Sequence, residues 1–288
     1  MAPQESAPRI VVGVDGRGRA DAAVHAAFAL ARAQRAEVEL VHAPEIPRRL
    51  WQHVSPELLA QARAATVAHL AKALSDLAVS QDELNGRLHV EQGSPAQVLI
   101  ARAQGAAWIF LGSHHRDGAL TFGNNVRAVL ARAASPVWVQ PAPFSGVQRV
   151  LAAVDLSEPS RAVLARARDI AAAFQAQVEV LHVFVRPDLG YVLGYAVPFP
   201  VTVVEHARET AEAELQRLAK SIDWDGQHPT LRFEDGEPVS AILAAQHACD
   251  VLVLAGQGQG ALLGAVLGST ARRVLSEARK AVVLVGAR

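Results

Sequence analysis

The residues in this chain best suited to chemistry are glycines and hydroxyl residues gathered towards its carboxyl end. A glycine-rich segment, Gly256-Gln257-Gly258-Gln259-Gly260, is followed by Gly268-Ser269-Thr270. Glycine lets a backbone approach a ligand closely and adopt positive φ, and the unpaired N–H groups at a helix start favour anions. Together with the two hydroxyl groups, this pattern predicts a cradle for a chain of phosphates.

A carboxylate is placed to hold the other end of such a ligand. Asp155 follows the apolar run Leu151-Ala152-Ala153-Val154, and ligands of open α/β sheets bind at the carboxyl ends of the strands. A carboxylate at that place accepts hydrogen bonds from ribose hydroxyls or from an adenine amino group. The alternative, in which Asp155 only stabilises a turn, stays open, as does a plain turn role for the glycines.

Two familiar phosphate motifs do not fit. A Walker A loop needs Lys and then Ser or Thr after its last glycine, and this segment has neither in place. The segment 256–261 formally fits G-x-G-x-x-A, but that fingerprint follows a first strand and needs an acidic residue at the end of the second. Here it follows the fourth predicted strand, and Glu277 falls within a predicted helix.

Much of the chain is repeated at an offset of 140 residues. Val38-Glu39-Leu40-Val41-His42 corresponds to Val178-Glu179-Val180-Leu181-His182, and Asp15 corresponds to Asp155. The repeat predicts two domains of ordinary size, residues 1–143 and 147–288, called here the first and second halves. The linker between them is short and Pro-rich, so we expect the halves to pack against each other.

Short β-branched runs alternate with Ala-rich helical stretches. Near-continuous apolar strands are typical of a parallel sheet covered by helices on both faces. The predicted strands are residues 9–14, 37–42, 87–91, 108–112 and 137–140, then 149–154, 177–183, 230–234, 251–255 and 281–285. The pattern predicts an α/β fold of two tandem doubly wound domains, each a Rossmann-like five-stranded parallel sheet flanked by helices.

Three serines are predicted to cap helices. Ser55 and Ser94 each precede a proline, which suits the first helical position, and Ser94 also has a glutamine at the capping-box position. Ser160 is predicted to cap a helix over 161–174. The apolar segment 189–204 contains two glycines and two prolines, so it is predicted to be a flap or an interface loop.

Composition excludes several classes of protein. The chain has 28 basic and 28 acidic residues, and this balance argues against a nucleic-acid partner. The single cysteine, Cys249, is interpreted as buried packing and indicates a reducing, cytoplasmic location. No apolar run reaches membrane-spanning length. His114 and His115 are adjacent and would point apart on an extended segment, so no metal site is predicted; the repeat-equivalent His42 and His182 indicate a shared structural place.

These residues resemble the universal stress protein family, as two such domains in tandem. The family's ATP-binding pattern, G-x2-G-x9-G-[ST], follows a fourth strand, and the second half reads Ala255-x2-Gly258-x9-Gly268-Ser269. The resemblance implies ATP or another adenine nucleotide, with or without Mg²⁺, as the ligand. It implies contacts from Ala153, Val154, Asp155, Val183, Leu254, Ala255, Gln257, Gly258, Gly268, Ser269 and Thr270.

The first half departs further from the family pattern. It keeps Asp15 and Gly112, but His115 replaces the second glycine and the spacer shortens from nine residues to seven, so that Gly123 is followed by Asn124. A histidine side chain would stand where backbone must approach phosphate. The nucleotide is therefore predicted mainly in the second half, with these five residues as weaker equivalents.

The implied function is regulatory binding of a nucleotide in a stress response. Two alternatives stay open: an interaction protein that no longer binds nucleotide, and a weak ATPase. No catalytic residues are predicted, because no Ser-His-Asp arrangement or carboxylate pair stands out. The resemblance also implies pairing of edge strands, with 137–139 and 282–285 as the segments that would pair the halves within one chain. A homodimer of chains is a further alternative.

Overall fold

The computed structural model describes residues 7–112, 114–116, 119–121, 124–186, 200–257 and 267–286. Each half contains five parallel strands in the order third, second, first, fourth, fifth. The strands are β1 (Arg9–Gly13), β2 (Glu37–His42), β3 (Leu88–Val90), β4 (Trp108–Gly112) and β7 (Val137–Gln140), then β8 (Arg149–Val154), β9 (Gln177–Phe184), β10 (Thr230–Asp235), β11 (Val251–Ala255) and β12 (Ala281–Val285). The predicted α/β class and doubly wound sheets are confirmed.

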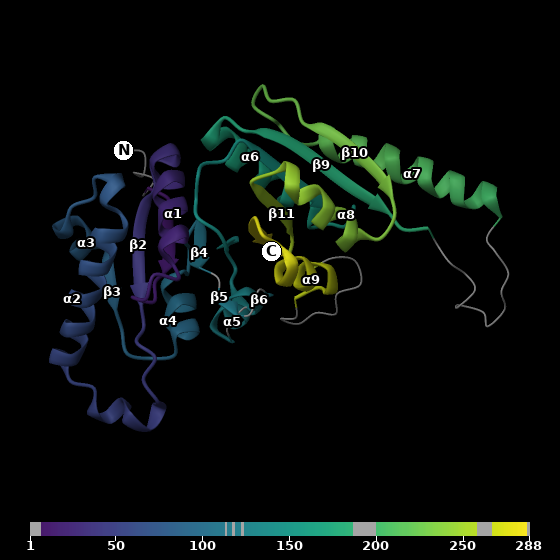
Figure 1. Ribbon diagram of the computed structural model, residues 1–288. Helices are drawn as coiled ribbons and strands as arrows, with labels where there is room; N and C mark the ends of the chain where they lie inside the picture. The colour runs from purple at the N-terminus through teal and green to yellow at the C-terminus, as the bar shows by residue number, and fades with distance from the viewer. Residues whose placement is uncertain are drawn as a thin grey trace, which may run out of the picture.

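Helices cover both faces of the sheets (Figure 1). In the first half they are α1 (Asp21–Gln34), α2 (Pro56–Ala73), α3 (Gln81–Arg87), α4 (Pro95–Arg102) and α5 (Asn124–Arg132), with short 3₁₀ turns at Arg48–His53 and Ser75–Leu77. In the second half they are α6 (Ser160–Phe174), α7 (Val201–Lys220), α8 (Pro238–Ala245) and α9 (Ser269–Glu277), with a 3₁₀ turn at Gln246–Ala248.

Alternation along each strand divides the apolar residues between two core layers. In β1, Ile10 and Val12 join the layer that contains α1 and α6. Val11 points to the opposite layer, which contains α4, α5, α8 and α9. Because successive side chains of a strand face opposite sides, a run of apolar residues fills both layers.

The two halves form one continuous sheet. β7 and β12, each the fifth strand of its own half, pair antiparallel, with Val282 opposite Val139, Val283 opposite Trp138 and Leu284 opposite Val137. These are the two segments that the family resemblance implied would pair. The result is a ten-stranded sheet whose outer edges are β3 and β10.

Trp138 lies at the centre of this junction. Its fully buried ring stacks on Phe110 at 5.1 Å and meets Trp108 edge-on at 6.4 Å. Its Nε1 donates to Gln140 Oε1 at 2.8 Å, so the indole N–H is satisfied. The guanidinium of Arg166, on α6 of the second half, lies 5.4 Å from the Trp108 ring, so a cation–π contact also crosses the junction.

Several expected features differ in the structure. Residues 201–204, predicted to end a loop, form the first turn of α7, because Pro200 is the N-cap residue and its missing N–H breaks no helical hydrogen bond. Residues 189–199 lie outside the described residues. The spacer after β4 contains a hairpin, β5 (His114–Arg116) paired with β6 (Ala119–Thr121), that was not predicted. No helix in the described part of the chain is long and apolar enough to cross a membrane.

Candidate functional site

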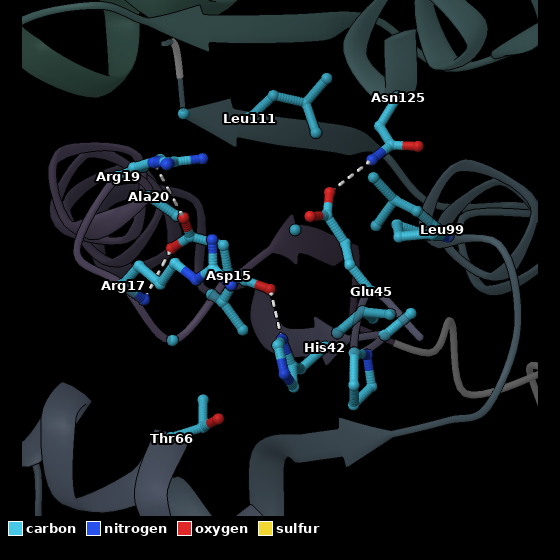
Figure 2. A pocket seen from close by; sticks show the side chains of 18 of the residues that line it. Asp15, Arg17, Arg19, Ala20, His42, Glu45, Thr66, Leu99, Leu111 and Asn125 are labelled. Atoms are coloured by element: carbon cyan, nitrogen blue, oxygen red, sulfur yellow. Dashed lines mark hydrogen bonds and ion pairs between the residues drawn. The ribbon is translucent and has the colours of Figure 1, made fainter. Parts of the chain in front are cut away.

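A cavity of about 420 Å³ opens at the carboxyl ends of β1, β2 and β4 in the first half (Figure 2). Its walls come from these strand ends, from α2, and from the first residues of α4 and α5. Small and branched apolar side chains predominate among them. The polar and charged lining residues are Asp15, Arg17, Arg19, His42, Glu45, Thr66 and Asn125. This is the edge of a parallel sheet at which ligands bind, and the size suits a small molecule.

Asp15 sits in a tight turn directly after β1. Its Oδ1 accepts a hydrogen bond from the Arg17 backbone N–H at 3.1 Å. Gly16 and Gly18 take φ values of +64° and +85°, which glycine adopts readily because it has no Cβ atom. The other oxygen, Oδ2, is buried and has no hydrogen-bond partner among the described residues, although Arg19 Nε lies 3.8 Å away. The turn therefore holds a carboxylate with an unused acceptor in the cavity wall.

Gly112 is needed at the end of β4 for packing. A Cβ atom on Gly112 would lie 2.1 Å from the carbonyl oxygen of Arg19 and 2.8 Å from the Cα atom of Ala20. The strand end thus touches the backbone that leads into α1, and no larger residue fits without a shift. The motif glycine is explained here by contact within the protein, with or without a ligand.

Two repeat-equivalent histidines support the aspartate turns. His42 Nδ1 donates to the carbonyl oxygen of Val14 at 2.8 Å, and His182 Nδ1 donates to that of Val154 at 2.9 Å. Both rings are buried. Since a carbonyl only accepts, each bond fixes the proton on Nδ1. The predicted structural place for these histidines is confirmed: each ties the end of a second strand to the residue before Asp15 or Asp155.

Asp155 is more fully engaged than Asp15. Its Oδ1 accepts from the Ser157 backbone N–H at 3.1 Å, from the Ser157 hydroxyl, and from the Ser160 hydroxyl at 3.1 Å. Ser160 was expected to cap its helix; that expectation is wrong, because the residue is the first of α6 and its side chain makes no capping bond. The Ser160 hydroxyl instead donates a hydrogen bond to Asp155 and helps to orient its carboxylate. Leu156 takes the left-handed conformation, φ +60°, that Gly16 takes in the first half.

The predicted second-half residues converge on the same sheet edge. Parallel pairing sets Ala153 beside Leu254, and Val183 lies in the last part of the neighbouring β9. Gly256 N–H donates to Val285 O at 2.8 Å, and Gly268 N–H donates to Gly256 O at 2.8 Å, so the start of α9 is held against the end of β11.

The first turn of α9 is not closed by a capping side chain. Gly268 is the N-cap residue, and Ser269 and Thr270 are the first two helical residues. Backbone N–H groups at such a start point outwards and favour an anion. Ala255 and Gln257 lie on the adjoining segment, while Gly258 lies outside the described residues.

The repeat connects the two sites residue by residue. Cavity-lining residues of the first half correspond to residues predicted to bind ligand in the second: Gly13 to Ala153, Val14 to Val154, Asp15 to Asp155, Ala43 to Val183, Leu111 to Leu254, Gly112 to Ala255 and Asn125 to Thr270. The described cavity thus lies, in the first half, at the position equivalent to the one predicted to bind nucleotide in the second half.

Only some of the first-half residues that were predicted as weaker equivalents line the cavity. Asp15 and Gly112 line the cavity. His115 is the middle residue of β5 and pairs with Leu120, and Asn124 is the first residue of α5. Gly123 lies outside the described residues. Glu45, Thr66 and Asn125 line the cavity but were not singled out, because no family motif contains them.

Other groups are accounted for structurally. Burial raises the pKa of the Cys249 thiol to about 12, so this side chain is a protonated packing group, as predicted. Among the described residues, no group of three or more His, Cys, Asp or Glu side chains is arranged to hold a metal ion.

Comparison with known proteins places the chain in a family. The model of the universal stress protein family matches twice, at residues 7–141 and 146–286. A universal stress protein of Mycolicibacterium smegmatis (strain ATCC 700084 / mc(2)155) is 26% identical over 292 residues, which cover 96% of each chain.

Solved structures show the same fold at low identity. A universal stress protein from Archaeoglobus fulgidus DSM 4304 is 16% identical with a TM-score of 0.60, covering 96% of this chain and 98% of its own. A putative universal stress protein from Pseudomonas aeruginosa UCBPP-PA14 is 20% identical with a TM-score of 0.65, covering 98% of this chain and 94% of its own. With a family match over nearly the whole length, in two copies, the chain belongs to the universal stress protein family.

Proposed function

We propose that the chain is a regulatory module that binds ATP or another adenine nucleotide, chiefly in its second half. The observation that carries this proposal is the start of α9. It is an uncapped helix start with two hydroxyl residues, held by the Gly268–Gly256 hydrogen bond at the carboxyl edge of the sheet. Backbone N–H groups and hydroxyls in that position suit the phosphates of a nucleotide.

The base and sugar would lie along the strand ends. In the first half the equivalent strand ends enclose the described cavity, which is of a size for a small ligand. In the second half Ala153, Val183 and Leu254 provide apolar walls at the corresponding positions. Asp155 supplies a carboxylate that is already oriented by two serines, and a carboxylate accepts hydrogen bonds from ribose hydroxyls or from an adenine amino group.

Regulation would follow from linkage. A ligand that binds one conformation or assembly better than another shifts the balance in proportion to that difference. The site joins β8, β11 and α9, and β11 lies beside β12, the strand that carries the junction between the halves. A nucleotide held there is placed to stabilise the junction.

The test begins with nucleotide carried through purification, identified after the protein is denatured. ATP is then titrated into nucleotide-free protein by calorimetry, and the melting temperature is followed. At a ligand concentration of 100 times Kd, binding stabilises a protein by about 2.7 kcal/mol, so a rise in melting temperature is expected.

A matched pair of variants locates the site. Ser269→Glu adds a carboxylate to the first turn of α9, where a helix tolerates it but a phosphate does not, and is expected to weaken ATP binding by about tenfold or more. Asn124→Glu makes the same change at the equivalent position of α5 and is expected to leave ATP affinity unchanged. Absence of both carried nucleotide and an ATP-dependent melting shift would refute the proposal. Loss of ATP binding in Asn124→Glu alone would show that the nucleotide binds in the first half and not in the second.

A further inference from the structure

The first-half cavity carries an acidic side chain at the place where the second half is proposed to hold phosphate. Glu45 lies three residues beyond His42 and is exposed at the cavity mouth. Its Oε1 accepts a hydrogen bond from Asn125 Nδ2 at 3.4 Å. Asn125 is the second residue of α5 and corresponds to Thr270 of α9. Figure 2 shows the Glu45 side chain reaching from the end of β2 towards this helix start.

The chain therefore supplies its own anion at the start of α5. A carboxylate near the N-terminus of a helix is stabilised by the helix dipole, as a bound phosphate would be. A phosphate brought to the same place would meet that carboxylate at close range, and the two like charges would repel each other. The corresponding residue of the second half, Val185, is uncharged.

The two arginines that line this cavity lie away from Glu45. Arg17 and Arg19 lie on the opposite side of the cavity from α5, beside Asp15 (Figure 2). Arg19 pairs with the Asp15 carboxylate at 3.8 Å, and the Arg17 backbone N–H donates to the same carboxylate. Arg19 is therefore the cation paired with Asp15, and Glu45 lies across the cavity from both arginines.

The remaining cavity suits an uncharged ligand. Its walls include Val14, Val41, Leu99 and Leu111, and its polar groups include the Asp15 carboxylate, whose Oδ2 lacks a hydrogen-bond partner among the described residues. Acceptors in apolar walls favour a ring that carries hydrogen-bond donors. We propose that the first half binds a neutral ligand of the nucleoside class and rejects its phosphorylated forms, with Glu45 as the residue that makes the distinction.

The experiment uses the full chain with adenosine and ATP as probes, a choice that rests on the proposed function. Hydrogen exchange of peptides covering residues 13–20 and 41–45 reports binding in the first half, and calorimetry gives affinities. Measurements are made in wild type and in Ser269→Glu, so that binding in the second half is observed separately and its failure does not affect the first-half result.

Adenosine is expected to protect the first-half peptides, with ATP bound there about tenfold or more weakly. Glu45→Gln removes the charge but keeps the shape, and is expected to bring the affinity for ATP within about threefold of that for adenosine. Glu37→Gln is the matched control, since Glu37 is exposed at the opposite end of β2, and it should leave the ratio unchanged. Absence of protection by adenosine, equal binding of ATP in wild type, or an unchanged ratio in Glu45→Gln would each overturn the proposal.

Discussion

At the scale of single residues, Gly112 occupies a position at the cavity wall that leaves no room for a side chain. Because an added Cβ would lie 2.1 Å from Arg19 O, Gly112→Ala must displace the turn that carries Asp15. Overpacking of this kind costs about 2 kcal/mol, so we expect the free energy of unfolding in urea to fall by that amount.

Gly256→Ala is the matched control for this prediction. A Cβ atom there would lie 3.5 Å from Val285 O and 3.8 Å from Leu267 Cδ1, which are ordinary contacts. We expect its free energy of unfolding to change by less than about 0.5 kcal/mol. Equal effects of the two substitutions would contradict the packing role of Gly112.

From the sequence, the motif residues and the paired histidines could be placed at strand ends, but the structural role of each side chain could not be predicted. Asp15 and Gly112 do line a cavity, and the paired histidines have the same role in both halves. The sequence did not reveal that Gly112 packs against the backbone of Arg19, or that Glu45 accepts a hydrogen bond from Asn125 of α5. Both contacts join segments that are far apart in the chain, and no sequence motif predicts that these segments meet.

At the scale of elements, two helices begin with the same sequence pattern but differ in their caps. Ser55 and Ser94 are each the N-cap residue before a proline. Ser55 Oγ accepts from the Leu58 backbone N–H at 3.3 Å, whereas the Ser94 side chain makes no capping bond. Ser55→Ala should lower the free energy of unfolding by about 1 kcal/mol, and Ser94→Ala by no more than about 0.3 kcal/mol.

Chemical denaturation of the two variants under one set of conditions decides this point. A loss for Ser94→Ala as large as that for Ser55→Ala would show that the Ser94 hydroxyl caps α4 in solution. The comparison also isolates the side-chain bond, because both helices retain proline at their first position.

Strands were more predictable than helix starts and connections. Short apolar, β-branched runs bounded by turn residues indicate the position and length of each strand. A serine before a proline can cap a helix, but whether it does depends on a side-chain rotamer that the spacing does not fix. The hairpin β5–β6 escaped prediction because the shortened spacer was treated as a loop, and its strands of three residues are too brief to show alternation.

At the scale of the whole molecule, the register of β7 and β12 is symmetric. Trp138 and Val283 are repeat-equivalent residues, and they lie directly opposite each other at the centre of the pairing. The neighbouring pairs, Val282 with Val139 and Leu284 with Val137, are related by the same exchange. The halves are therefore joined as the subunits of a two-fold dimer would be, with an isologous contact contained in one chain.

Separating the halves should replace this pairing within one chain by pairing between two chains. Residues 147–288 alone would leave β12 as an exposed, apolar edge strand, and such edges pair with other chains. The symmetric register lets β12 pair with a second β12, Val283 opposite Val283. We expect light scattering to show a homodimer. A longer fragment, residues 134–288, keeps β7 to cover its own β12, so it should dimerise far less. A well-folded monomer from residues 147–288 would mean that β12 does not need a partner strand, and that the junction contributes little to the stability of either half.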